Sequence, residues 1–267
     1  MYEFCRYVDD IADKKNIGKS IKLKNIIKDL NYNSKNYKLS SIKLLIKKNI
    51  IRKHHILQLI DGVNLDLKKM VRIKNDKELI SYAYLVAGTV GLMMANILKT
   101  KEKAAYKYAI DLGIAFQLTN IARDILEDAQ INRIYLPSSW EKLNINSIKF
   151  PNKKNKSKLV SATKRILILA EKYYQSALKG LAFLNLRNRF AILLALIIYR
   201  QIGLKIIRKG FSNLYKRETI SFFEKTICLL KCIGLFLFNG NIHKKNYRHN
   251  KKLHKHIKDI AIVNINP

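Results

Sequence analysis

Apolar residues recur every three or four positions through most of this chain, the spacing that places them on one face of an α-helix. The pattern predicts eight helices, at residues 2–15, 19–30, 40–60, 76–98, 102–129, 157–184, 187–209 and 217–239. Segments 31–40 and 144–157 are predicted to be loops. Only 10 Gly and 3 Pro occur in 267 residues, so few positions interrupt the helices. We therefore expect an all-α fold.

The domain organisation follows from the same pattern, which shows no internal repeat and no linker between two domains. We expect one helical domain over residues 1–239, followed by a basic, histidine-rich tail over residues 240–267. The histidines of this tail are His243, His249, His254 and His256. Because they lack the ordered spacing of a metal motif, the sequence favours a solvated and loosely ordered tail.

The charge balance is strongly basic, with 52 Lys and Arg against 19 Asp and Glu and a formal net charge of +33. Such a surplus suggests nucleic acid, an anionic membrane or an anionic substrate as partner. The chain is also rich in Ile, Asn and Tyr, so codon bias of an A/T-rich genome is our preferred cause of the charge. No recognisable nucleic-acid module or interleaving of basic and stacking aromatic residues is present, which argues against a nucleic-acid partner. Peripheral membrane association remains open.

The cysteines and the apolar runs bear on the compartment. Cys5, Cys228 and Cys232 form no secreted-type disulfide framework, and an odd count suits a reducing cytoplasm. Cys228 and Cys232 share a helix face and are predicted to be buried thiols. The first residues lack the order of a signal peptide. The best apolar run, residues 190–199, is about half the ~20 residues of a membrane crossing. We expect a cytoplasmic protein, with association at the inner membrane face as an open alternative.

The scarce acidic residues gather in two clusters, and the first lies near the N-terminus. On a helix, Asp9 and Asp13 are one turn apart and point the same way, with Arg6 flanking them. Like charges at this spacing weaken a helix unless a cation lies between them. Mg²⁺ is typically held by one or two carboxylates together with substrate phosphates. A metal–diphosphate site and a solvated acidic turn both fit this cluster alone.

The second cluster aligns an amide with two carboxylates. Asn120, Asp124 and Asp128 follow an i, i+4, i+8 rhythm on one helical stripe, and Gln117 joins it. Arg123 and Glu127 form an adjacent stripe. A surface helix needs no such alignment for stability, and two such stripes among 19 acidic residues favour a metal–diphosphate site.

These clusters resemble the two Asp-rich motifs of the squalene/phytoene synthase family. Residues 2–13 resemble the first motif, and residues 115–128, with the Arg-Ile-Tyr-Leu-Pro run at 133–137, resemble the second. Residues 82–94 resemble the family's cavity-lining helix. The resemblance extends to about Lys225, and the second motif is its most specific part.

The resemblance implies an isoprenoid synthase fold, with helices around a central cavity and the two acidic stripes facing each other across its mouth. It implies Mg²⁺, with Mn²⁺ as a substitute, held by Asp9, Asp13, Asn120, Asp124 and Asp128. It implies catalytic roles for the four aspartates and for Tyr82 and Tyr199. The substrate-binding residues that it implies are Tyr2, Arg6, Val86, Gly91, Gln117, Asn120, Arg123 and Arg217.

The expected reaction is a head-to-head condensation of two prenyl diphosphates through a cyclopropyl diphosphate. Residues 119–124 and 136–140 resemble bacterial phytoene synthases more than squalene synthases, which implies geranylgeranyl diphosphate as substrate and no NADPH. We expect a monomer. Two alternatives stay open: a squalene or dehydrosqualene synthase that uses farnesyl diphosphate, and a truncated, non-catalytic family member.

The chain departs from the family pattern in a few places. An opening helix that the family usually carries before its first motif is expected to be missing, and Asn132 replaces the usual Gly. The small residues at 88–91 fit two roles, close packing of helices and room for a prenyl tail.

Overall fold

The computed structural model describes all residues except 14–17, 32–36, 101, 212–215, 246 and 262–267, and only the backbone of Asp13 and Asn31. The described chain is all-α, as predicted. Its first half contains α1 Tyr2–Asp13, α2 Lys19–Asn31, η1 Tyr37–Leu39, α3 Ser40–Lys47, α4 Lys53–Leu65, α5 Asp76–Ala83, the π-helical turn η2 Tyr84–Gly88, α6 Thr89–Ile97, α7 Ala104–Arg123 and α8 Ile125–Gln130. The second half contains α9 Ile145–Lys149, α10 Lys153–Gly180, η3 Leu181–Phe183, α11 Leu186–Arg208, α12 Phe222–Phe238, η5 Gly240–His243, η6 Lys251–His254 and α13 Lys258–Ala261.

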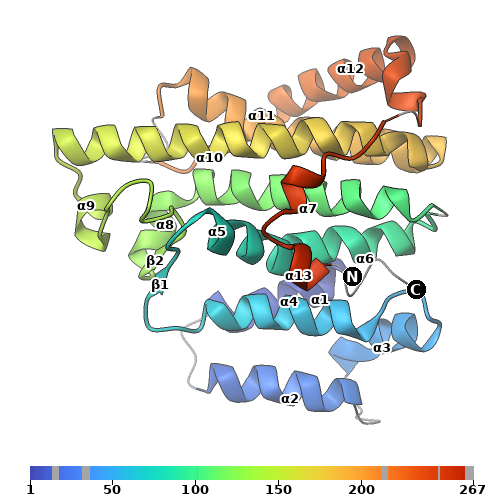
Figure 1. Cartoon of the computed structure of the whole chain (residues 1–267), viewed down its shortest axis with the longest axis horizontal. Helices are drawn as coiled ribbons and strands as arrows, with labels where there is room; N and C mark the ends of the chain where they lie inside the picture. Colours follow the sequence, from blue (N-terminus) through green and yellow to red (C-terminus); the bar gives the residue numbers. More distant parts are fainter. Residues whose placement is uncertain (14–17, 32–36, 101, 212–215, 246, 262–267) are drawn as a thin grey trace.

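The long helices lie side by side in layers. In Figure 1, α10, α7, α6, α4 and α2 follow one another from top to bottom, and α12 covers α11 at the upper edge. Two short strands, β1 Val71–Arg72 and β2 Arg133–Ile134, pair in parallel. This pairing ties the segment after α4 to the segment after α8. It therefore brings two loops from distant parts of the sequence to the same end of the bundle.

Three predicted helices are interrupted in the structure. The helix predicted at 40–60 is split into α3 and α4, and Asn49 between them has a φ of 53°, a left-handed conformation that ends a helix. The helix predicted at 76–98 is confirmed in extent but contains the π turn η2. The helix predicted at 102–129 breaks at Asp124, whose φ of −105° and ψ of 20° separate α7 from α8. A single-residue break leaves the apolar periodicity nearly intact, which is why the pattern did not show it.

Capping side chains set helix starts that periodicity misplaced. Asn152 accepts a hydrogen bond from the backbone N–H of Asn155, so α10 begins inside the segment predicted to be a loop. Ser221 and Glu224 form a reciprocal capping box, so α12 begins at Phe222 and the segment before it is not helical. The helix predicted at 187–209 agrees with α11.

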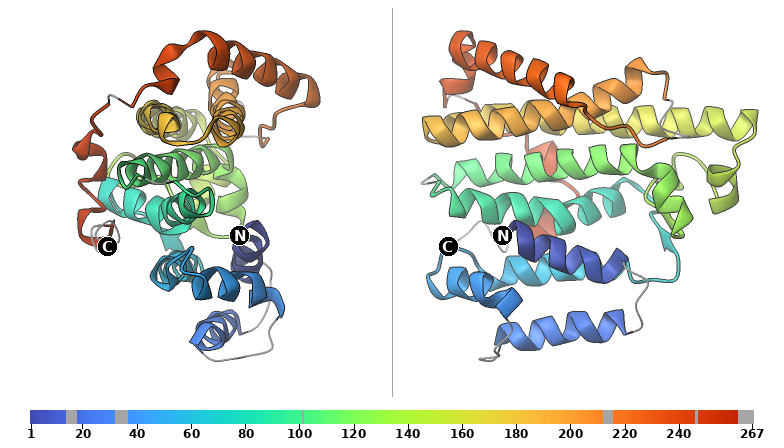
Figure 2. Two further views of the ribbon diagram at one scale, coloured as in Figure 1. Left: turned by 90° about the vertical axis from the view of Figure 1, so that its right-hand side faces the viewer. Right: turned by 180° about the vertical axis from the view of Figure 1, so that it is seen from behind.

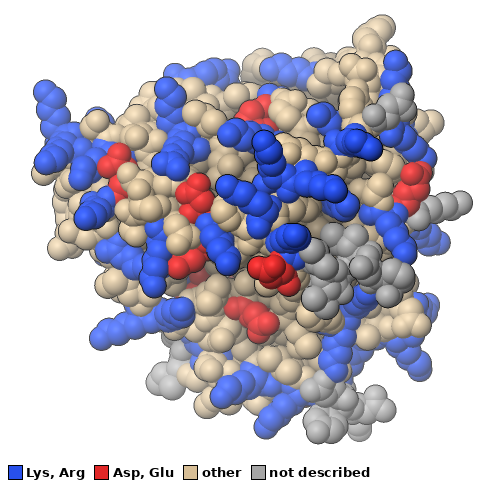
Figure 3. Space-filling model, viewed as in Figure 1, with Lys and Arg blue, Asp and Glu red and all other residues tan. Residues whose placement is uncertain are grey.

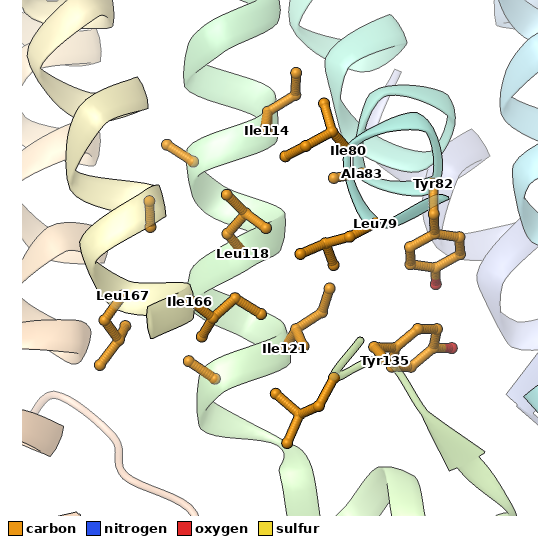
Figure 4. Close-up of a cluster of buried hydrophobic side chains, with 14 of the residues drawn as sticks. Leu79, Ile80, Tyr82, Ala83, Ile114, Leu118, Ile121, Tyr135, Ile166 and Leu167 are labelled. Carbon is orange, nitrogen blue, oxygen red and sulfur yellow. The ribbon is translucent and has the colours of Figure 1, made fainter. Parts of the chain in front are cut away.

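The core is formed where α5, α7 and α10 meet. Figure 4 shows Leu79 and Ile80 packed against Leu118 and Ile121 of α7, with Ile166 of α10 beyond them. Each of these side chains is at most 3% exposed. A second apolar cluster joins α1, α2 and α4 beneath this core. The hydrophobic faces inferred from sequence are thus buried between helical layers.

Glycine permits the closest contact between α6 and α7. A Cβ on Gly91 would lie 2.1 Å from the backbone oxygen of Ala109, and one on Gly113 would lie 2.2 Å from that of Ala87. The backbones therefore touch where only glycine fits. The packing role expected for residues 88–91 is present.

The expectation for the histidines of the tail was wrong. Residues 240–245 and 247–261 fold back over the bundle and cross α10, α7 and α5 (Figure 1), on the side opposite α1 (Figure 2, left). His249 and His254 are nearly buried against Asp111 of α7, and His243 contacts Arg189. Lys and Arg cover much of the face that this segment crosses (Figure 3). The basic composition of the tail is visible in the sequence, but its contact with the buried carboxylate of Asp111 is not.

The prediction about membrane-spanning length was also wrong. Two helical stretches, Asp76–Ile97 and Leu186–Arg208, are long and apolar enough to cross a bilayer. An uninterrupted apolar run underestimates such a stretch, because single polar residues break the run without lowering the mean hydropathy much. Half of the most apolar window in the first stretch is buried in the fold. Core helices of soluble proteins pass the same test, so length alone does not place either helix in a membrane.

Candidate active site

Two adjoining cavities lie between the helices, one polar and one apolar. The polar cavity, of about 280 Å³, is lined from α1, α4, α7 and α8 and from the tyrosines Tyr82 and Tyr135. The apolar cavity, of about 430 Å³, runs between α6, α7, α10 and α11. Val86, Gln117 and Asn120 line both. The two cavities therefore meet at the π turn and at the middle of the second acidic motif.

The second acidic cluster keeps its predicted alignment across the helix break. The Asp124 N–H donates to the Asn120 carbonyl at 2.9 Å, and the Asp128 N–H donates to the Asp124 carbonyl at 2.8 Å. These i→i+4 bonds continue the helical spacing, so Asn120, Asp124 and Asp128 all face the polar cavity. Gln117 lines it as well.

Two arginines hold Asp124. Arg123 donates from Nε and a terminal nitrogen to the two carboxylate oxygens, at 2.7 and 2.6 Å, and Arg217 Nε lies 2.8 Å from Oδ1. Burial would lower the pKa of the Arg123 guanidinium, but Asp124, Tyr199 and Glu127 raise it above its usual value. Arg217 reaches Asp124 from the non-helical segment before α12. Asp124, on the wall of the polar cavity, is therefore held by two cations, of which Arg123 also lines the cavity.

Asn120 presents a buried oxygen that lacks a hydrogen-bond donor. Its Oδ1 has no partner among the described residues, although the side chain faces both cavities. Glu127 Oε2 is likewise buried and has no hydrogen-bond partner among the described residues. A buried polar atom without a partner costs free energy, so such an oxygen indicates a missing cation or donor. Amide and carboxylate oxygens are the ligands that Mg²⁺ prefers.

The first acidic cluster contributes from α1. Arg6 and Asp9 line the polar cavity, and Arg6 Nε lies 3.2 Å from Asp10 Oδ1. The side chain of Asp13 lies outside the described residues. Tyr2, at the start of α1, is 79% exposed and lines neither cavity. The structure thus brings Arg6 and Asp9 to the second cluster but leaves Tyr2 apart from it.

The sequence reasoning missed a hydrogen-bonded group around Asp66, which follows α4. Its carboxylate accepts hydrogen bonds from the hydroxyls of Tyr82, at 2.8 Å, and Tyr135, at 2.7 Å. The two rings stack with centroids 4.8 Å apart, as Figure 4 shows at the edge of the core. Burial, Asp66 and Tyr135 raise the pKa of Tyr82 well above its usual value, so its hydroxyl stays protonated.

Arg133 completes this group. One of its terminal nitrogens donates to the backbone oxygens of Ala12, at 3.2 Å, and Asp66, at 3.3 Å, so it fastens the end of α1 beside the end of α4. The only signal for Asp66 was a scarce carboxylate outside the two clusters. Its partners come from strand pairing and from helix packing, which single-sequence periodicity does not contain.

The remaining predicted residues line the apolar cavity. Tyr199 of α11 stacks on Phe116 of α7, with ring centroids 4.2 Å apart. Gly91 lines the same cavity while allowing α6 and α7 to touch, so the packing role and a place on the cavity wall are both present. Val86 lies in the π turn, a local widening of the helix that is frequent at functional sites.

Comparison with known proteins gives the family. The sequence matches the model of the family described as "Squalene/phytoene synthase" over residues 1–224. The chain belongs to the squalene/phytoene synthase family. It is 33% identical over 257 residues to a 15-cis-phytoene synthase of Enterobacter agglomerans, covering 88% of this chain and 84% of that protein. It is 40% identical over 176 residues to a 15-cis-phytoene synthase of Pantoea ananas, covering 66% of this chain and 57% of that protein.

The fold agrees with solved structures. A dehydrosqualene synthase in complex with a ligand superposes with a TM-score of 0.73 at 25% identity, covering 87% of this chain and 83% of that one. A squalene synthase from Alicyclobacillus acidocaldarius gives a TM-score of 0.69 at 18% identity, covering 78% of this chain and 81% of that one, which shows the common fold. The isoprenoid synthase fold expected from sequence is confirmed.

Proposed function

We propose that this chain is a phytoene synthase, a prenyltransferase that joins two geranylgeranyl diphosphates head to head. The observation that carries the proposal is the junction of the two cavities at Val86, Gln117 and Asn120. A prenyl diphosphate has a charged head and a long apolar tail. A polar cavity with carboxylates and arginines that opens into an apolar one matches both parts of that molecule. The names of the bacterial relatives support the same reaction.

The polar cavity suits Mg²⁺ bound together with diphosphate. Asp9, Asn120, Asp124 and Asp128 would hold the metal, and the buried Oδ1 of Asn120 supports this assignment. Among the described residues, no three carboxylates of the two clusters converge within 4.8 Å of one another. Mg²⁺ is usually held by one or two carboxylates plus substrate phosphates, so a diphosphate between the clusters would complete each site. Bound metal would neutralise negative charge on the departing diphosphate.

The arginines and the cavity walls would perform the rest of the first step. Arg123 and Arg217, which both pair with Asp124, would stabilise the charge that develops on the leaving diphosphate. Breaking the C–O bond leaves an allylic cation, and the double bond of the second substrate attacks it. Loss of one proton closes the cyclopropyl diphosphate. In the second step this intermediate loses its own diphosphate, rearranges and loses a proton to give phytoene.

The aromatic and apolar side chains would protect these cations. Tyr199 and Phe116 stack at the wall of the apolar cavity, where their ring faces would stabilise positive charge. The hydroxyl of Tyr82 is held by Asp66, which fixes its ring at the edge of the polar cavity. Exclusion of water is essential, because water would capture either cation.

The test is to incubate purified protein with geranylgeranyl diphosphate or farnesyl diphosphate, with and without Mg²⁺, and to separate the hydrocarbon products. We expect a C40 hydrocarbon with a central conjugated triene that requires Mg²⁺ and disappears in Asp128→Ala. Asp259→Asn, which changes an exposed carboxylate outside both cavities, should keep full activity. A C30 product alone would replace phytoene synthase by a farnesyl-using synthase, and no product from either substrate would refute the proposed catalysis.

We also propose that the protein binds membranes peripherally through α12. The large apolar side chains Phe222, Phe223, Leu230, Leu237 and Phe238 are between 64% and 88% exposed, and the chain is strongly basic. A hydrocarbon product would leave into lipid more readily than into water. The fraction of protein that sediments with anionic vesicles should be lower for the double variant Phe222→Ser/Phe223→Ser than for the wild type. Equal fractions for the two proteins would exclude α12 as the membrane-binding surface.

A further inference from the structure

A second polar cluster lies outside both cavities, where the C-terminal segment crosses α7. The carboxylate of Asp111 is fully buried, with 0% of its side chain exposed. His249 Nε2 lies 2.8 Å from one of its oxygens, and His254 Nε2 lies 2.7 Å from the other. The two imidazoles are only 8% and 12% exposed. One ligand atom from each of the three side chains lies within 4.8 Å of the other two.

This donor set differs in chemistry from the acidic clusters of the polar cavity. Two imidazole nitrogens and one carboxylate oxygen are typical ligands of Zn²⁺ and related transition metals, whereas Mg²⁺ prefers oxygen alone. With ligand bonds of about 2.0–2.1 Å in tetrahedral geometry, nitrogen and oxygen would stand about 3.3 Å apart. The present separations are 2.7 and 2.8 Å. These are hydrogen bonds to the two different oxygens of Asp111, so each imidazole would have to move away from the carboxylate by about half an ångström for the ion to bind.

The surroundings orient the carboxylate and both rings. Ser176 of α10 donates a 2.5 Å hydrogen bond to Asp111 Oδ2, and the ring of Tyr108 packs edge-on against His249. Groups that hold the ligands in place raise metal affinity. The metal would bind the Nε2 lone pair, so each neutral ring would carry its proton on Nδ1.

The same segment is bound along its length to other helices. Tyr108 and Tyr173 donate to the backbone oxygens of Tyr247 and Leu253, both at 2.8 Å, and Gln58 donates to that of Ile260 at 3.0 Å. Tyr108 also lines the apolar cavity. A metal at Asp111 would thus pin the segment to the outer side of the helix that forms the cavity wall.

We propose that Asp111, His249 and His254 supply three ligands of a Zn²⁺ site, with water as the fourth, that fastens the C-terminal segment to α7. The site is separate from the diphosphate-binding carboxylates and does not depend on the proposed reaction. By mass action, the metal stabilises the folded chain by RT ln(1 + [Zn²⁺]/Kd), so the unfolding temperature should rise with the free Zn²⁺ concentration.

The experiment uses the full-length chain without a histidine tag, stripped with chelator and refilled with Zn²⁺. Bound metal is measured by mass spectrometry after desalting, and affinity by competition with a chromophoric chelator. We expect one equivalent of Zn²⁺ and a higher unfolding temperature. His249→Ala and His254→Ala should each weaken binding by at least about 100-fold. His54→Ala, a change of an exposed histidine, and Asp124→Asn, in the polar cavity, should bind as the wild type does.

Two results would overturn the site. One is Zn²⁺ binding that is absent in the wild type or unchanged in both histidine variants. The other is loss of binding in Asp124→Asn, which would move the metal to the polar cavity. Circular dichroism checks that each variant is folded, and His254→Gln serves if the alanine variant is not. Co²⁺ in place of Zn²⁺ should give a ligand-field absorption band that only the histidine variants lose.

Discussion

Asp111 lies within α7 and Asp124 directly follows the last residue of that helix, yet their surroundings are opposite. Thirteen residues separate them, which turns their side chains about 140° apart around the axis. Asp111 is completely buried and accepts hydrogen bonds from Ser176, His249 and His254. Asp124 is 20% exposed at a cavity and is held by arginines. Asp111 is therefore hydrogen-bonded to a serine and two histidines inside the fold. Asp124 is paired with two arginines beside the polar cavity.

This difference indicates that Asp111 serves stability and that Asp124 serves catalysis. Burial would raise the pKa of Asp111, but its hydrogen bonds from the two histidines lower it below the usual value, so the charge is retained inside the protein. A buried charge that is held by side chains from other elements stabilises the fold. A charge that faces a cavity is available to a ligand. Four variants test this division.

The largest expected effect is on catalysis. Asp124→Asn removes the charge that orders Arg123 and would bind metal, so kcat should fall by on the order of 10²–10³-fold. The unfolding temperature should stay within a few degrees of the wild type, because Asp124 is partly exposed. Steady-state kinetics and thermal unfolding measure the two quantities. A large drop in the unfolding temperature with little change in kcat would contradict the division.

The next effect is on stability. Asp111→Ala leaves His249 and His254 facing an apolar gap and should lower the free energy of unfolding by about 3–5 kcal/mol. Denaturant titration measures it. The folded fraction should keep a kcat within about threefold of the wild type, since Asp111 lies outside both cavities. A specific loss of kcat in folded protein would show that the C-terminal segment shapes the active site.

His55 sharpens the comparison, because it is buried like Asp111 but has no hydrogen-bond partner for its ring nitrogens within the described part of the chain. It is 1% exposed, and neither ring nitrogen has a hydrogen-bond partner among the described residues. Burial, with His54 and Arg52, lowers its pKa from 6.5 to about 4. Between these values the unfolded chain binds more protons, so stability should fall by on the order of 3 kcal/mol as pH drops from 6.5 to 4.

Unfolding curves across that pH range measure this loss. His55→Leu should flatten the pH dependence, whereas His54→Ala should keep most of it because His54 is exposed. An identical slope in His55→Leu and in the wild type would show that another group controls acid stability.

The smallest expected effect is that of Arg217. Its ion pair with Asp124 is about half exposed on the arginine side, so Arg217→Ala should change the free energy of unfolding by less than about 1 kcal/mol. Its effect should appear in kcat/KM for the prenyl diphosphate, by roughly tenfold, because one cation that would stabilise charge on the leaving group is lost. Arg208→Ala, on the exposed end of α11, is the matched control and should change neither quantity.

Most of the helical fold could be predicted from the sequence. Apolar spacing located α2 and α11 closely, because amphipathic periodicity is a local property. The break at Asp124 and the split at Asn49 were missed, since each depends on the backbone angles of one residue. The start of α10 depends on the cap at Asn152. The segment around it is rich in Asn and Lys, so the sequence was interpreted as a loop there.

The candidate site divides in the same way. The alignment of Asn120, Asp124 and Asp128 follows from helical spacing and survives the break between α7 and α8. The group of Asp66, Tyr82, Tyr135 and Arg133 could not be predicted, because it depends on pairing between β1 and β2. Tyr2 was expected at the site from resemblance, and the structure leaves its side chain in solvent.

By itself the sequence determined the helices, the two acidic stripes and the family, because these depend on spacing along one chain. Only the tertiary structure decided that a polar and an apolar cavity meet at Val86, Gln117 and Asn120. It also decided that a histidine-rich tail closes over a buried Asp111. Both depend on contacts between residues far apart in sequence, whose distances are set by the packing of helical layers and by no local pattern.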